Sequence, residues 1–172
     1  MIRAAKQSDI AAVEKSYIEL LEHEQNSGTF SNWKLGVYPT RQTAQNALEK
    51  GWLFVLEENG DICASMIVNT VQPCEHEKIA WKYKVDDDKA VTVHTLCVPP
   101  SKAGHGYGRM MMQYALDFAK KAGYEVVRLD TYAGNLPAQS LYKKLGFSSP
   151  GTAHVTLEGL ITEELMYFEY LL

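Results

Sequence analysis

Glycines stand at every second position from Gly104 to Gly108, between an expected strand and an expected helix. The strand covers residues 91–98, and the helix covers residues 108–121 and is followed by Gly123, a typical helix end. A further strand is expected at residues 125–132. A strand, a crossover helix and a next strand in this order form a parallel unit. This half of the chain is therefore restricted to an α/β arrangement.

The remaining segments add antiparallel strands and more helices. Asn59-Gly60 is a strong hairpin signal between two apolar segments. Ser8 and Asn135 are residue types that begin helices, and Gly51 and Gly146 are residues that end them. The further strands are expected at residues 2–5, 52–56, 62–71, 155–158 and 165–171, and the further helices at about 8–21, 39–50 and 135–145. The pattern predicts a mixed sheet with helices on both faces.

The composition limits the class of protein. With 172 residues, the chain is expected to form one domain over residues 1–172. The net charge of −4 argues against a dedicated nucleic-acid binder. No apolar run reaches the length of a membrane span, and the first residues are too polar for a signal peptide. The three cysteines are scattered, which favours a reducing compartment, so we expect a cytoplasmic protein without a membrane partner.

The glycine loop has the properties of a phosphate site. Alternate glycines let a ligand approach the backbone and leave N–H groups pointing outward, and a helix N-terminus adds about half a positive charge. Lys102 and Arg109 are further candidate cations. The loop lacks the Gly-Lys-Ser/Thr ending of a P-loop, and Arg109 replaces the third glycine of a dinucleotide fingerprint. The alternative is a glycine-rich turn without a ligand.

Two stretches resemble the GNAT family of N-acetyltransferases. The segment from Val98 to Gly108 is similar to the family's acetyl-coenzyme A loop, Arg/Gln-x-x-Gly-x-Gly/Ala. Gly106 and Gly108 match its two small positions, whereas Ala103 stands where Arg or Gln is usual. The second stretch is Asn135-x-x-Ala138-x-x-Leu141-Tyr142-x-x-Leu145-Gly146-Phe147.

The resemblance implies a GNAT-like fold, with a mostly antiparallel sheet and a parallel strand pair at the cofactor site. It also implies acetyl-coenzyme A as co-substrate and a set of residues that contact it. These are Leu96, Cys97, Val98, Ala103, Gly104, His105, Gly106, Tyr107, Gly108, Arg109, Asn135 and Tyr142.

Three residues are candidates for catalysis. The resemblance implies that Tyr142 protonates the departing thiolate, and a tyrosine with a pKa of about 10 holds that proton at pH 7. The alternative is a core tyrosine. Asp130 is the first candidate base for the amine; pairing with Arg128, two residues away on the same strand face, is the equal alternative. His94 is the second candidate base, and the alternative is a histidine that is hydrogen-bonded in the core.

The cysteines and histidines do not predict a metal site. Cys74, His76, His94 and Cys97 are the residue types that bind zinc. However, His94 and Cys97 are three residues apart on one strand, so they point to opposite faces. We predict that no metal is needed.

The favoured function is an N-acetyltransferase that acts by direct transfer to a primary amine of a small molecule or peptide. A non-catalytic acyl-coenzyme A sensor and an enzyme that acetylates a protein or tRNA are the alternatives, and a homodimer is left open. Residues 24–38 and 73–89 hold the aromatic and acidic groups that would suit a cationic amine. We expect Asp86, Asp87 and Asp88 to lie in solvent.

Overall fold

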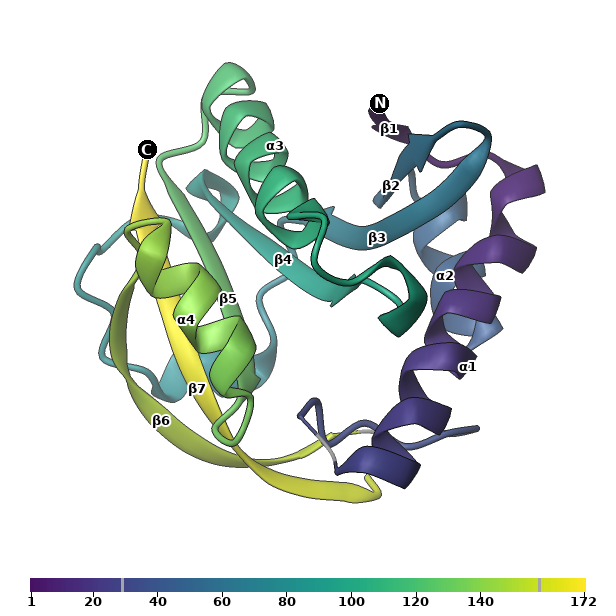
Figure 1. The fold of residues 1–172 in the computed structure, drawn as a ribbon. Coiled ribbons are helices and arrows are strands. Elements are labelled where there is room, and N and C mark those ends of the chain that lie inside the picture. Colours follow the sequence, from purple (N-terminus) through teal and green to yellow (C-terminus); the bar gives the residue numbers. More distant parts are fainter. Residues whose placement is uncertain (29, 158) are drawn as a thin grey trace. The chain divides into compact units, whose positions relative to one another are not determined.

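The computed structural model describes residues 1–28, 30–157 and 159–172, leaving out the side chains of Cys74 and Leu157. The chain divides into two compact units. The first comprises Met1–Thr29, Trp33–Val68 and His94–Tyr114, and the second comprises Phe30–Asn32, Asn69–Val93 and Ala115–Leu172. Figure 1 labels the helices and strands used below.

The first unit contains an antiparallel strand set covered by two helices. Its strands are β1 (Ile2–Ala4), β2 (Leu53–Glu58) and β3 (Asp61–Asn69), paired in that order. Its helices are α1 (Ile10–Ser27) and α2 (Arg41–Glu49), and two short 3-10 turns are η1 (Gln7–Asp9) and η4 (Pro100–Lys102). The apolar core joins Ile10, Val13 and Tyr17 of α1 to Ala44 and Ala47 of α2 and to Leu53, Val55 and Ile67 of the strands.

The predicted hairpin is confirmed. Asn59 and Gly60 connect β2 to β3 with φ angles of 54° and 86°, the left-handed conformation that this dipeptide adopts at low cost. Thr40 begins α2, and its side chain accepts a hydrogen bond from the Thr43 N–H.

An ion-pair cluster fixes the start of the chain to β2. The Arg3 guanidinium donates to both carboxylate oxygens of Asp9, at 2.7 and 3.1 Å, and to Glu57 Oε2 at 2.6 and 2.9 Å. Asp9 is buried, and Arg3 holds the pKa of its carboxyl below the ordinary value. A depressed folded-state pKa stabilises the fold above the unfolded pKa, and the contribution is lost as pH falls through the folded value.

We therefore expect Asp9→Asn to lower the free energy of unfolding by about 1–3 kcal/mol at pH 7, because the Arg3 charge loses a buried partner. The difference from the wild-type protein should shrink below about pH 4, where the carboxyl itself takes up a proton. Urea unfolding of both proteins between pH 3 and 7 measures this, and a pH-independent difference would contradict it.

The second unit is built on a strand set with one parallel pair. The first half of β4 (Ala90–Cys97) pairs in parallel with β5 (Val126–Tyr132). β5 pairs antiparallel with β7 (Ile161–Leu171), which pairs antiparallel with β6 (Ser148–Leu157), as Figure 1 shows. Helix α4 (Leu136–Lys144) and the 3-10 turns η2 (Cys74–Lys78) and η3 (Asp87–Lys89) belong to this unit, whereas α3 (Tyr107–Lys121) begins in the first unit and ends in the second. The expected mixed α/β fold, mostly antiparallel with one parallel pair, is confirmed.

Two local expectations were wrong, namely the start of β6 and the solvated loop that the polar, irregular composition of residues 73–89 predicts. β6 begins at Ser148, seven residues before the expected start, because its irregular pairing with β7 accommodates Pro150 and Gly151 near a strand end. The segment of residues 73–89 is not simply a solvated loop, since His76, Ile79 and Trp81 are buried in it. Asp86, Asp87 and Asp88 are exposed, as expected.

The buried faces of two helices also differ from the expected ones. The helical spacing of Met111, Ala115 and Phe118 predicts that they share the buried face of α3. Met111 and Ala115 are buried, but Phe118 is 37% exposed. On α4 the same spacing predicts a core-facing stripe of Ala138, Leu141 and Leu145. That stripe is only half-buried, while Gln139 and Tyr142 are buried. Aromatic partners for Tyr142 on β7 and after α4 explain this rotation of the buried face.

Within the part of the chain that the structure describes, no helix combines the length and the apolar character needed to cross a bilayer.

Candidate functional site

The glycine loop has the backbone that its sequence predicts. Gly104 and Gly106 have φ angles of 82° and 76°, in the left-handed region, and a Cβ at either position would meet open space. α3 starts directly afterwards, at Tyr107, so its first N–H groups border the loop. Gly104, His105 and Gly106 are exposed. The loop therefore has free room above its backbone and the positive end of a helix beside it.

The side chains around this loop are engaged elsewhere in the first unit. The Tyr107 hydroxyl donates to the Glu58 carboxylate, and its ring is stacked on His105 with centroids 5.4 Å apart. Lys102 Nζ donates to Asp61 Oδ2 at 2.8 Å, so this candidate cation already has a carboxylate partner. An anion at this loop would therefore meet chiefly backbone N–H groups, with exposed Arg109 as the nearby cation.

In the strand before the loop, Thr95 has a φ of 51°, which is unusual for a β-branched residue. The parallel ladder of β4 covers only Ala90–Thr92, so Leu96, Cys97 and Val98 lie beyond it. Cys97 is fully buried, and its thiol contacts the Ser16 carbonyl oxygen at 3.8 Å. Burial raises the pKa of this thiol, which makes it a core residue rather than a nucleophile.

Tyr142 lies on the buried face of α4 in the second unit. Its ring packs against Phe147 and Phe168, with centroid distances of 6.0 and 5.3 Å. Burial, and secondly the charge of Asp130, raise the pKa of its hydroxyl above the ordinary value. The residue therefore stays protonated through the neutral range, and it lies within electrostatic range of Asp130.

Asp130 has a partner that the sequence did not indicate. His76 Nε2 lies 3.0 Å from Asp130 Oδ2, although the two residues are 54 positions apart. His76 is 2% exposed, and Gln72 Oε1 lies 3.2 Å from its Nδ1. Arg128, the expected alternative partner of Asp130, instead donates to the Tyr83 carbonyl oxygen at 3.2 Å. The carboxylate is thus oriented by a buried histidine and keeps a quarter of its side chain exposed.

The sequence also gave no indication that Glu163 is buried. Glu163 of β7 is 5% exposed and accepts a hydrogen bond from Asn32 Nδ2 at 3.1 Å. Burial raises the pKa of Glu163, and the nearby charge of Asp130 acts in the same direction. The sequence did not predict this burial, since a glutamate in a strand of alternating polarity is usually on the solvated face.

The other two predicted residues have the following places. Asn135 caps α4: its Oδ1 accepts from the Ala138 N–H at 3.2 Å and its Nδ2 donates to Thr131 at 3.1 Å. The side chain therefore has a structural role whether or not it contacts a cofactor. His94 is half-buried on β4 and belongs to the first unit, whereas Asp130 and Tyr142 belong to the second.

No group of three or more potential metal ligands occurs among the described residues; the side chain of Cys74 lies outside them. That no metal is needed stays a prediction. We expect dialysis against a chelator to leave any transferase activity unchanged, and a loss that zinc restores would contradict this.

Known proteins resemble this chain in both sequence and fold. The sequence profile of the Acetyltransferase (GNAT) family matches residues 17–147. Streptothricin acetyltransferase of Streptomyces lavendulae is 30% identical over 76 residues, 44% of this chain and 40% of that protein. The N-alpha-acetyltransferase RimI of Mycobacterium tuberculosis is 39% identical over 59 residues, 34% of this chain and 35% of that protein. The matched segments thus span less than half the length of these curated relatives.

A solved structure agrees over the whole chain. The acetyltransferase of the GNAT family from Streptococcus agalactiae superposes with a TM-score of 0.83, covering 100% of this chain and 95% of that one at 19% identity. At this identity the likeness is evidence for the fold alone. The family profile covers most of the chain, including the glycine loop and the tyrosine helix, and on this ground the chain belongs to the acetyltransferase (GNAT) family.

Proposed function

We propose that residues 1–172 form a single acyltransferase domain, which moves the acetyl group of acetyl-coenzyme A to a primary amine by direct transfer. The observation that carries this proposal is the pair of a buried, protonated Tyr142 and a partly exposed Asp130 within its electrostatic range. A binding module would need neither group. Family membership supports the choice of acetyl-coenzyme A.

The residues of the first unit fit the phosphates of this co-substrate. The N–H groups of Gly104, Gly106 and the first turn of α3 would receive the pyrophosphate, because the left-handed glycines leave open space there. The backbone of residues 96–98, beyond the β4–β5 ladder, would hold the pantetheine arm and polarise the thioester carbonyl. Bound in this way, acetyl-coenzyme A supplies the activated acetyl group.

Asp130 and Tyr142 together balance the protons of the reaction. An amine of pKa about 10.4 must lose a proton before it attacks, at a cost of roughly 4 to 5 kcal/mol at pH 7. Asp130 takes that proton, directly or through water, while the new C–N bond forms and the C–S bond breaks. Tyr142 gives a proton to the departing thiolate. The second proton, which the nitrogen loses as it becomes an amide, restores Tyr142, while the first passes from Asp130 to solvent. Glu163, with its raised pKa, is a further candidate base beside the earlier candidate His94.

The acceptor is a primary amine of a small molecule or a peptide. One relative is named a streptothricin acetyltransferase and another an N-alpha-acetyltransferase, so both acceptors belong in the test. The net charge of −4 favours cationic acceptors over nucleic acid, and a cytoplasmic location fits the buried, reduced Cys63 and Cys97.

The test is thiol release from acetyl-coenzyme A in the presence of a panel of amines, including streptothricin, polyamines, amino acids and peptides with a free N-terminus. We expect release with at least one amine, together with mass gain of the acceptor by one acetyl group. If acetyl-coenzyme A raises the melting temperature but no amine supports release, the sensor function is correct instead.

We expect Asp130→Asn to lower turnover roughly tenfold at pH 7, because a water chain remains but its base is gone. The deficit should shrink toward pH 10, where more of the amine is already deprotonated. The pH–rate profile is the measurement, compared with that of the wild-type enzyme and read beside the melting curve. A deficit that is the same at every pH, with a lowered melting temperature, would assign Asp130 a structural role with His76.

A further inference from the structure

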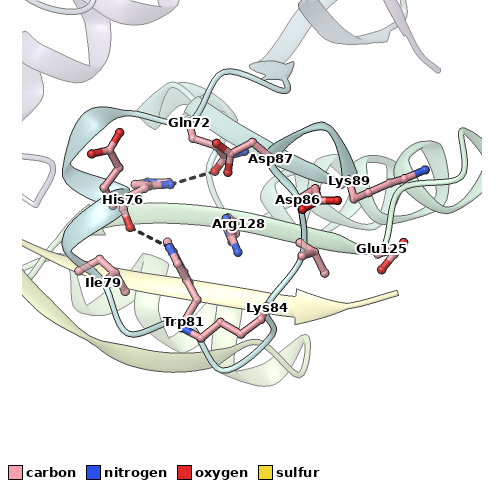
Figure 2. A pocket seen from close by; sticks show the side chains of 12 residues that line it. Gln72, His76, Ile79, Trp81, Lys84, Asp86, Asp87, Lys89, Glu125 and Arg128 are labelled. Atoms are coloured by element: carbon pink, nitrogen blue, oxygen red, sulfur yellow. Dashed lines mark hydrogen bonds between the residues drawn. The ribbon is translucent and has the colours of Figure 1, made fainter.

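The second unit contains a cavity whose lining includes neither Tyr142 nor any residue of the glycine loop. It has a volume of about 590 Å³, within the range of small-molecule sites. The residues that line it come from the segment of residues 72–89 and from β5: Gln72, His76, Glu77, Ile79, Trp81, Lys84, Val85, Asp86, Asp87, Lys89, Glu125 and Arg128. Figure 2 shows these side chains around the central Arg128.

Arg128 is the unusual member of this lining. It is only 4% exposed, its guanidinium carbon lies 4.5 Å from the centre of the Trp81 ring, and Nη2 donates to the Tyr83 carbonyl oxygen. Its Nε–H, however, is buried and finds no hydrogen-bond partner among the described residues. Buried donors are nearly always satisfied in native proteins, and an arginine fork matches a carboxylate with two parallel hydrogen bonds. A carboxylate in the cavity would supply the missing acceptor.

The other charged residues of the lining indicate that the ligand also carries a positive group. Besides Arg128, the cations are Lys84 and Lys89, while the acids are Glu77, Asp86, Asp87 and Glu125. A ligand with only negative charge would face four carboxylates, and a ligand with only positive charge would leave the buried Arg128 Nε–H without an acceptor, although the charges of Glu169 and Asp87 already act on this guanidinium. Asp86 makes no capping hydrogen bond to η3, so its carboxylate is not used in starting that turn.

The apolar wall completes the description of the ligand. Ile79 and Trp81 are buried and Val85 is half-buried, and they provide a surface for an aliphatic side chain. We propose that this cavity binds a free α-amino acid with an apolar side chain, whose carboxylate pairs with Arg128 and whose ammonium group pairs with Asp86 and Asp87.

This site goes beyond acetyl transfer, because its occupancy can be measured without acetyl-coenzyme A. The cavity is also connected to the candidate base through one residue. His76 lines the cavity, and its Nε2 lies 3.0 Å from Asp130 Oδ2. A ligand in the cavity would therefore touch the residue that orients the carboxylate.

The experiment is isothermal titration of the whole chain with L-leucine. Two analogues separate its charged groups: 4-methylpentanoate lacks the amine, and 3-methylbutylamine lacks the carboxylate. We expect saturable binding of leucine, with both analogues at least tenfold weaker. If leucine does not bind saturably, the proposal is wrong and water is the partner of the Arg128 Nε–H. Equal affinity for leucine and 4-methylpentanoate would overturn it as well.

Variants assign the two contacts. Arg128→Met keeps the length of a buried side chain, and leucine affinity should fall at least tenfold. The double variant Asp86→Asn with Asp87→Asn should lower leucine affinity to that of 4-methylpentanoate, and since both residues are exposed, its folding does not depend on the outcome for Arg128. Asp88→Asn is the matched control, because Asp88 is exposed in the same run but does not line the cavity. Unchanged affinity in the double variant, or an equal loss in the control, would refute the assignment.

Discussion

Tyr142→Phe is expected to lower turnover by about 10² to 10⁴ while the affinity for acetyl-coenzyme A changes little. The substitution keeps the ring, which packs between Phe147 and Phe168, and removes only the hydroxyl. Because burial already keeps this hydroxyl protonated, the loss should be nearly constant from pH 6 to pH 9. Steady-state rates with a good acceptor, beside a calorimetric titration of the co-substrate, measure both quantities.

A matched control is available on the same unit. Tyr170 also packs against Phe147, at 5.3 Å, so Tyr170→Phe removes a hydroxyl from the same aromatic group without touching α4. We expect this variant to retain full turnover. An equal loss in both variants would mean that aromatic packing, not proton donation, explains the effect. Full turnover of Tyr142→Phe would mean that the enzyme accelerates the reaction by positioning its two substrates and not by proton donation from this residue.

Gly106→Val should abolish the stabilisation of the fold by acetyl-coenzyme A. In the wild-type protein, a ligand at 100 times its dissociation constant adds about 2.7 kcal/mol, which corresponds to a rise in melting temperature of about 5–10 °C for a chain of this size. Valine is disfavoured at the observed φ of 76°, and its side chain would fill the open space above the loop. Thermal melts with and without the co-substrate give the result.

Strain alone must be separated from loss of binding. Gly123 follows α3 with a φ of 82° and equally open space, so Gly123→Val introduces the same backbone strain at the other end of the helix. It should melt at a lower temperature, as Gly106→Val should, but keep the rise caused by acetyl-coenzyme A. A folded Gly106→Val protein that still shows the full rise would contradict the assigned role of the loop.

Some features of this protein are encoded by neighbouring residues, and others depend on residues far apart in the chain. The Asn59-Gly60 turn, the order of β4, α3 and β5, and the start of α4 at Asn135 were all predictable. Each depends on residues within a few positions of one another, where backbone conformation and hydrogen bonding are local. The glycine loop belongs to this group, because its left-handed backbone is the conformation that glycine permits.

The errors share a different cause. The periodicity of α4 identified an amphipathic helix but placed its buried face on Ala138 and Leu141 instead of Tyr142. Which face is buried depends on the partner that packs there, and Phe168 of β7 lies 26 residues further along the chain. Likewise, the polar composition of residues 73–89 gave no sign that Trp81 packs on Tyr167.

The sequence by itself therefore determined the fold class, the family resemblance, the left-handed backbone of the glycine loop and the choice of Tyr142 as candidate acid, since all of these are encoded in short-range patterns. Only the tertiary structure decided the partners of the charged groups. It placed His76 against Asp130, buried Glu163, and enclosed Arg128 beside Trp81 in a cavity. The physical reason is that burial and pairing of a charge are set by residues distant in the chain, which no local pattern can specify.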